Sequence, residues 1–254
     1  MLHENELITI EEEMVINPDY VLRRFTLNNR INGLSVAISA IGAKIVSIKL
    51  DSGKHEIVTA IVDSSLQSTN GQRFEWNAHV VGLDSLLLTT NASSSQSITY
   101  QLTKDNELVL NGRFKGQQQQ NLFHPFYLNL NSTASSIDGH LIHVQSSSES
   151  GEVGALLSVS GDDIPFNMIG SQPCKLSFPE DMAKTTFDVV ISCLNDIVAT
   201  LEYGTRRMEL NLHNKANNTT VISCCRLRLR LTKDGVSLMP THMNEFTCVY
   251  KFLW

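Results

Sequence analysis

Residues Asn121 to Leu130 read Asn-Leu-Phe-His-Pro-Phe-Tyr-Leu-Asn-Leu, and the second half of this stretch predicts a strand over Phe126–Leu130. Pro125 comes directly before that strand. Proline has no backbone N–H, so within sheets it is found at edges and bulges. A bulge shifts the strand by one residue and sends the neighbouring side chain to the opposite face. Such a bulge would change the face of the sheet on which His124 lies.

Short runs of alternating or β-branched residues continue along the chain, separated by turn residues such as Asn32-Gly33. The chain has no long amphipathic helical pattern. We therefore predict an all-β fold, a large antiparallel β-sandwich, with a β-propeller as the structural alternative. The expected strands are Leu22–Leu27, Leu34–Ser39, Lys44–Leu50, Glu56–Ile61, Ala78–Thr89, Ser97–Leu102, Glu107–Phe114, Phe126–Leu130, His140–Gln145, Phe187–Cys193, Ile197–Tyr203, Met208–His213, Thr220–Leu231 and Phe246–Phe252.

The length of 254 residues suits one large domain with its own core. Residues 1–19 are rich in glutamate and end in Asn17-Pro18-Asp19, which indicates an acidic N-terminal lead-in. Residues 20–254 are expected to form the single domain.

The net charge of -6 provides no basic field for nucleic acid or an anionic membrane. The one basic run, Arg226-Leu-Arg-Leu-Arg230, alternates with leucine, which favours a strand with one polar and one buried face over a phosphate-binding patch. The N-terminal residues do not resemble a signal peptide and no apolar stretch is long enough to span a membrane, so we expect an intracellular protein, cytoplasmic or nuclear. The five cysteines lack zinc-type spacing, so they indicate reduced thiols, with no metal and no cofactor.

Several segments, in order, resemble the aldose 1-epimerase (galactose mutarotase) family. They include Gly42-Ala-Lys-Ile-Val-Ser-Ile, Val58-Thr-Ala-Ile-Val-Asp-Ser-Ser-Leu and Ile164-Pro-Phe-Asn. The catalytic strand of the family reads Asn-Leu-Thr-Asn-His-Ser-Tyr-Phe-Asn-Leu. Aligned without a gap, five residues of this chain match it: Asn121, Leu122, Tyr127, Asn129 and Leu130. The resemblance implies a shortened sandwich of the galactose mutarotase-like type.

The chain departs from the family pattern where the resemblance implies catalysis. The position of the family histidine that protonates the ring oxygen is Pro125, and His124 lies one residue early. Between Leu66 and Phe74 the segments that supply the sugar-binding arginine and the first histidine are missing, and Arg73 lacks the surrounding motif. The place of the catalytic glutamate is taken by Cys225 or Arg226.

Three residues are candidates for substrate binding. Asp188, in Phe187-Asp-Val-Val, corresponds by the resemblance to a sugar-binding aspartate, although a role at a strand edge is the alternative. Trp76 and Tyr127 are aromatic residues of the kind that form sugar platforms, and the alternative for each is a place in the core.

These departures predict a catalytically inactive, divergent mutarotase-like domain, a pseudoenzyme that acts as a protein-binding or scaffolding module. We expect a protein partner or self-association and allow a hexose ligand. Two alternatives stay open. One is an aldose 1-epimerase-type enzyme with altered site residues, in which His124 works with Glu245 or with another carboxylate. The other is a sugar-binding protein without turnover.

Overall fold

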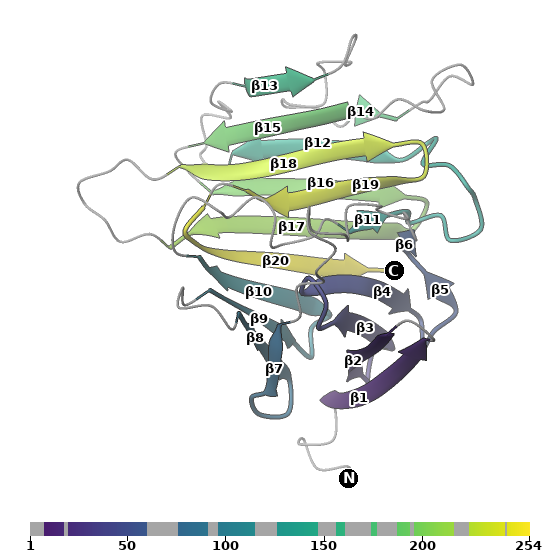
Figure 1. The fold of residues 1–254 in the computed structure, drawn as a ribbon. Coiled ribbons are helices and arrows are strands. Elements are labelled where there is room, and N and C mark those ends of the chain that lie inside the picture. Colours follow the sequence, from purple (N-terminus) through teal and green to yellow (C-terminus); the bar gives the residue numbers. More distant parts are fainter. Residues whose placement is uncertain are drawn as a thin grey trace.

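The computed structural model describes residues 8–17, 20–59, 76–90, 96–114, 126–146, 156–160, 174–176, 187–193, 196–215, 224–241 and 243–254. In these residues all regular secondary structure is β-strand, and every strand pair is antiparallel (Figure 1). The strands form three sheets of five, nine and six strands. The prediction of an all-β, antiparallel fold is confirmed. Within the described part of the chain, no helix is long and apolar enough to cross a membrane.

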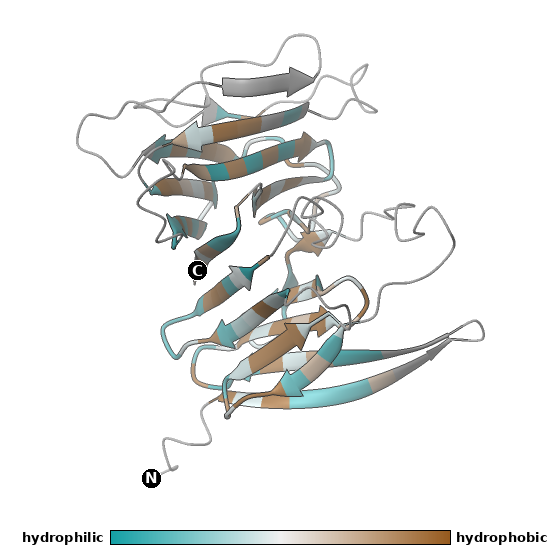
Figure 2. Cartoon of the chain, turned by 60° about the vertical axis from the view of Figure 1, so that its left-hand side comes forward, coloured by the Kyte–Doolittle hydropathy of each residue, from teal (hydrophilic) through white to brown (hydrophobic). Residues whose placement is uncertain are grey.

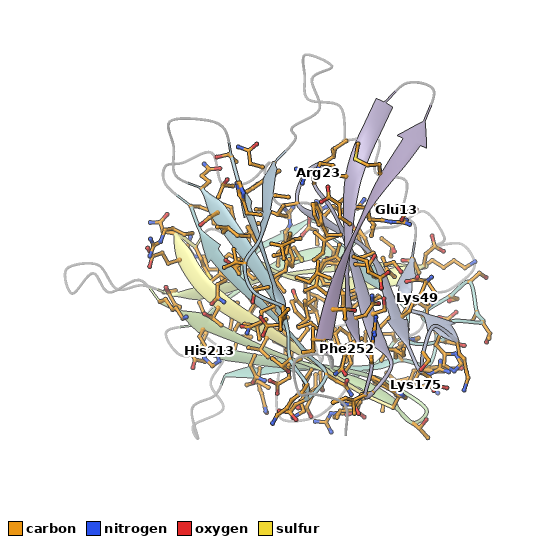
Figure 3. All side chains as sticks on the ribbon, turned by 90° about the horizontal axis from the view of Figure 1, so that it is seen from below. Glu13, Arg23, Lys49, Lys175, His213 and Phe252 are labelled. Atoms are coloured by element: carbon orange, nitrogen blue, oxygen red, sulfur yellow. The ribbon has the colours of Figure 1, made fainter. Side chains whose placement is uncertain are left out.

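The five-stranded sheet contains the N-terminal strands in the order β1-β2-β3-β4-β5. Residues 8–17, expected in the acidic lead-in, form strand β1 instead, and the hairpin β1–β2 spans the expected boundary at residue 19. Pairing offsets the acidic charge, since Glu12 contacts Arg23 and Glu13 contacts Arg24 on the neighbouring strand. Glu13 and Arg23 lie on the two strands of this hairpin (Figure 3). The strands are β1 (Ile8–Asn17), β2 (Tyr20–Asn29), β3 (Leu34–Ser39), β4 (Lys44–Leu50) and β5 (His55–Glu56).

The nine-stranded sheet has the order β14-β12-β16-β17-β20-β10-β9-β8-β7. Its middle strands alternate strictly between buried and partly exposed residues, as expected of strands with one face on a core. The strands are β7 (Asn77–Val80), β8 (Ser85–Thr89), β9 (Ser97–Leu102), β10 (Glu107–Arg113), β12 (Leu141–Ser146), β14 (Cys174–Lys175), β16 (Ile197–Tyr203), β17 (Arg206–Asn214) and β20 (Glu245–Leu253).

The six-stranded sheet has the order β13-β15-β18-β19-β11-β6 and lies over the nine-stranded sheet (Figure 1). Its long central strands are β15 and β18, which pair over seven residues from Phe187↔Leu231 to Cys193↔Cys225. The strands are β6 (Val58–Thr59), β11 (Tyr127–Leu128), β13 (Leu156–Ser160), β15 (Phe187–Cys193), β18 (Cys225–Thr232) and β19 (Gly235–Pro240).

One hydrophobic core joins the three sheets. The apolar residues recur at every second strand position, visible as alternating brown and teal bands in Figure 2. Two buried tyrosine hydroxyls connect sheets directly. Tyr250 of β20 donates to the carbonyl oxygen of Leu238 in β19 at 2.7 Å, and Tyr100 of β9 donates to the carbonyl oxygen of Ala43 at 2.6 Å. These directional bonds fix how the sheets stack.

Candidate functional site

A polar face covers the side of the six-stranded sheet that points away from the core. On β18 the three leucines are buried in the core, and the arginines between them point to the other side. The register places residues of the neighbouring strands on the same side, because directly opposite residues share a face of the sheet. We call this surface the arginine face. Val190 and Met239, opposite Arg228, also lie on this side, and Tyr127, Ser237 and Met239 are buried. The polar residues of the arginine face are Tyr127, Asp188, Ser192, Arg226, Arg228, Arg230 and Ser237.

Asp188 is the centre of the arginine face. Its side chain is 14% exposed and accepts hydrogen bonds from Arg228 through Nε at 2.8 Å and through Nη2 at 2.5 Å. Arg230 donates through Nε to the same carboxylate at 2.8 Å. Burial alone would raise the pKa of the Asp188 carboxyl, but the hydrogen bonds and charges of the two arginines outweigh it and hold the pKa below its usual value. Asp188 is therefore an ionised, strongly hydrogen-bonded carboxylate.

Arg230 links Asp188 to Tyr127. Burial alone would lower the pKa of the Arg230 guanidinium, but the hydrogen bond and charge of Asp188, with a smaller contribution from Tyr127, raise it. Tyr127 can approach because Gly235 has no side chain. A Cβ at Gly235 would lie 2.8 Å from the Cβ of Tyr127 and 2.8 Å from Oγ1 of Thr59. This glycine lets β11 and β6 join the sheet beside the arginine face.

The structure brings two of the predicted site residues together and places a third in the core. Asp188 and Tyr127 meet through Arg230, as described above. Trp76 is 1% exposed in the core, and its backbone N–H donates to the carbonyl oxygen of Ala40, next to the five-stranded sheet. Its ring therefore offers no open platform to a ligand. His124 lies outside the described residues.

The other positions singled out by the family resemblance have mixed outcomes. Pro125 and Arg73 also lie outside the described residues. Of the two residues that could occupy the place of the family glutamate, Cys225 is buried in the core and Arg226 lies on the arginine face opposite Ser192. Glu245, the alternative partner for His124, pairs with Arg113 at 3.0 Å on the nine-stranded sheet.

Sequence reasoning missed Arg228 and Arg230 as partners of Asp188. It predicted β18 as a strand with a polar and a buried face, which is confirmed. The contact with Asp188 depends on β15 pairing with β18, about 40 residues further along the chain, and no local pattern carries that pairing. The sequence signal for this contact is weak: Asp188 is an acidic residue in one predicted strand, and arginine alternates with leucine in another.

A second polar cluster, the His140 cluster, lies where the loop after β11 meets the turn between β16 and β17. His140 is fully buried. Its Nδ1 lies 2.8 Å from the carbonyl oxygen of Ile137, an acceptor only, so Nδ1 carries the proton and Nε2 accepts the N–H of Leu130 at 3.1 Å. Burial lowers the pKa of His140, opposed in part by the bond to Ile137 and the charge of Asp138.

The surroundings of His140 are equally well connected. The ring of Tyr203 stacks on the imidazole with centroids 4.7 Å apart, and its hydroxyl accepts a hydrogen bond from Asn131 at 2.9 Å. Arg206 donates to the carbonyl oxygen of Leu130 at 2.6 Å. Both nitrogens of His140 are engaged within the protein, so the cluster fixes the loop rather than exposing a reactive group.

The buried thiols are poor nucleophiles. Burial raises the pKa of both Cys225 and Cys248 to about 12. A thiol with that pKa carries almost no thiolate at neutral pH. Among the described residues, no group of three histidine, cysteine, aspartate or glutamate side chains could hold a metal ion.

The comparison with solved structures identifies the architecture. The galactose 1-epimerase from Lactobacillus acidophilus NCFM superposes with a TM-score of 0.58 at 10% identity, over 96% of this chain and 98% of that chain. The GalM/aldose epimerase homologue from C. elegans gives a TM-score of 0.55, also at 10% identity, over 96% and 99%. The chain has the aldose 1-epimerase fold. At this identity the likeness concerns the fold alone. No family model matches the sequence, and no curated protein sequence matches it.

The mutarotase-like fold confirms the resemblance read from the scattered motifs. Of the motifs that carry the resemblance, Gly42-Ala-Lys-Ile-Val-Ser-Ile lies in the turn before β4 and in β4 itself. The loss of catalysis remains a prediction, as does a scaffolding role.

Proposed function

We propose that this chain is a mutarotase-like domain that binds a carbohydrate on the arginine face without turning it over. The observation that carries the proposal is the state of Asp188, whose carboxylate is held by Arg228 and Arg230. The mutarotase-like fold supplies the carbohydrate context. The arginine face supplies planar polar groups of the kind that orient a ligand by hydrogen bonds.

Anomer interconversion needs an acid and a base within reach of one bound sugar, and each contributes about 10²–10⁴-fold. Asp188 is a weak base, because its pKa is lowered and its oxygens already accept three hydrogen bonds. The other polar residues of the arginine face are arginine, serine and tyrosine, whose usual pKa values lie far from neutral pH. This set can bind hydroxyl groups, but it is poorly suited to moving protons.

Polarimetry tests the absence of turnover. Freshly dissolved α-galactose and α-glucose are followed with and without the purified full-length protein, and we expect the same rate of mutarotation in both samples. A protein-dependent rate of enzymatic size would overturn this part of the proposal and favour the alternative of an altered aldose 1-epimerase.

Calorimetric titration tests carbohydrate binding. The panel contains neutral hexoses, hexose phosphates and hexuronic acids, because the sugar is not specified by the fold. Heat that saturates with at least one member supports the proposal. If no member of the panel binds at millimolar concentration, carbohydrate binding is overturned.

A hollow beside the N-terminal hairpin favours a second function, the binding of an extended protein segment. Its volume is about 360 Å³, and it is lined by β1 and by the turn between β7 and β8. Val80 and Leu83 there are 51% and 58% exposed, and Oγ1 of Thr9 is buried without a partner in the described part of the chain. Among the described strands, β1 and β7 are the outer strands of their sheets, and such edges accept an added strand.

Sedimentation velocity and a pull-down, each with wild-type protein and Leu83→Ser, test this second function. Leu83 is more than half exposed, so the substitution should leave the fold intact. Loss of a partner or of a self-associated species in Leu83→Ser supports docking at the hollow. An unchanged monomer that captures no protein in either form would argue against it.

A further inference from the structure

We propose that the ligand of the arginine face is anionic: a sugar carrying a phosphoryl or carboxyl group, whose charged oxygens bind between Arg226 and Ser192. This inference rests on the proposed carbohydrate-binding function and specifies the class of ligand. Three independent observations carry it: surplus positive charge, unused donors, and a buried hydroxyl without a partner.

The arginine face has more cations than anions. Three guanidinium groups lie on it with one carboxylate, that of Asp188, which leaves two positive charges in excess. The protein as a whole has a net charge of -6, so this surplus is concentrated against the overall balance.

Donors for a ligand remain above all on Arg226. Arg228 donates through Nε and Nη2 to Asp188, and Arg230 donates through Nε to Asp188 and is also hydrogen-bonded to Tyr127. Among the described residues, Arg226 has no carboxylate within ion-pair distance, whereas on the nine-stranded sheet Arg113 has one and Arg207 has two. Guanidinium groups match phosphate and carboxylate oxygens with paired N–H donors.

The third observation is Ser192. It lies directly opposite Arg226 in the β15–β18 register. Its Oγ is buried and has no hydrogen-bond partner within the described residues. A buried hydroxyl without a partner costs free energy, so such groups in native proteins usually indicate a missing ligand or water. An anionic oxygen between Ser192 and Arg226 would accept a hydrogen bond from each.

Calorimetric titrations of the full chain with four probes test the inference: glucose, glucose 6-phosphate, glucuronate and inorganic phosphate. We expect at least one charged sugar to bind about tenfold tighter than glucose, because charge-assisted hydrogen bonds are about twice as strong as neutral ones. Raising the ionic strength from about 0.01 M to about 0.15 M should weaken binding of the charged sugar and leave that of glucose unchanged.

Two matched variants locate the site. Arg226→Gln removes one charge from the arginine face. It should lower the affinity for the charged sugar about tenfold and leave the affinity for glucose unchanged. Arg113→Gln makes the same chemical change on the nine-stranded sheet and should leave both affinities as in the wild type. Thermal unfolding of both variants confirms that they are folded.

The outcomes separate the inference from the function on which it rests. The inference of an anionic ligand would be overturned by equal affinity for glucose and the charged sugars. It would also be overturned by an equal fall in affinity for the charged sugar in both variants. Neither result would contradict carbohydrate binding. Binding of inorganic phosphate alone would overturn the sugar as ligand. If none of the sugars binds, both proposals are overturned.

Discussion

The arginine face and the His140 cluster are both rich in polar side chains, yet they differ in how fully those side chains are satisfied. Around His140, both ring nitrogens are engaged within the protein, and the neighbouring Arg206 donates to the carbonyl oxygen of Leu130 and contacts His55. On the arginine face, two positive charges remain unmatched, and the hydroxyl of Ser192 has no partner among the described residues. A cluster whose buried polar atoms are bonded within the protein stabilises a fold, whereas a cluster with surplus charge and an unpartnered hydroxyl is suited to a ligand.

The largest expected effect comes from removing the centre of the His140 cluster. His140→Ala leaves the N–H of Leu130 without a partner, removes the stack on Tyr203 and opens a cavity. We expect a loss of about 3 kcal/mol in the free energy of unfolding, measured by urea denaturation. His213→Ala is the control, because His213 is 44% exposed and pairs only with the exposed Asp196. Equal stability of the two variants would show that the His140 cluster is not structural.

The corresponding change on the arginine face should cost less stability. Asp188→Ala leaves Arg228 and Arg230 without their shared carboxylate. Fully buried pairs lose about 3–5 kcal/mol when one partner is removed, but Arg228 is 38% exposed, so we expect about 2 kcal/mol. The matched control is Glu209→Ala, which breaks an exposed pair with Arg207. The same variant should bind anions more tightly than the wild type, and weaker anion binding would contradict the role of the surplus charge.

A smaller effect separates the ring of Tyr203 from its hydroxyl. Tyr203→Phe keeps the stack on His140 and removes the acceptor for Asn131. We expect a loss of about 1 kcal/mol or less in chemical denaturation. Tyr203→Leu, which also removes the stack, should cost more. The reverse order would assign the stabilisation to the hydroxyl alone.

The most subtle difference is in pH dependence. The folded pKa of His140 lies below its unfolded value of about 6.5, so below that pH the unfolded chain binds a proton that the folded chain does not. Stability contributed by neutral His140 is therefore complete above about pH 6.5 and declines as the pH falls. The loss of stability between about pH 7 and pH 5.5 should be larger in the wild type than in His140→Ala. An identical loss in both would show that His140 titrates equally in both states.

Much of the fold could be predicted from local patterns. The expected ranges Leu34–Ser39, Lys44–Leu50, Phe187–Cys193 and Ile197–Tyr203 coincide with β3, β4, β15 and β16, because each strand has one buried face. Alternation fails where both faces are covered. All six residues of β19 are buried, so Gly235–Pro240 shows no period of two and was not predicted.

Turns and pairings caused the other differences. Ala78–Thr89 was expected as one strand, but the chain turns at Gly82, with φ of 83°, and forms the hairpin β7–β8. Asp188 could be proposed from the family resemblance, and Tyr127 from its aromatic ring. Their connection through Arg230 could not, because it requires strands distant in sequence to be neighbours in one sheet.

The two tyrosines that connect the sheets also determine how the protein responds to alkali. Burial raises the pKa of the Tyr100 and Tyr250 hydroxyls far above the usual value of about 10. Each hydroxyl must stay protonated to donate to its carbonyl, so the folded protein keeps protons that the unfolded chain releases above that pH. Their stabilisation is complete below about pH 10 and is lost as the pH rises further. In a spectrophotometric titration, these two of the five tyrosines should ionise only together with unfolding, so phenolate absorbance would report separation of the sheets.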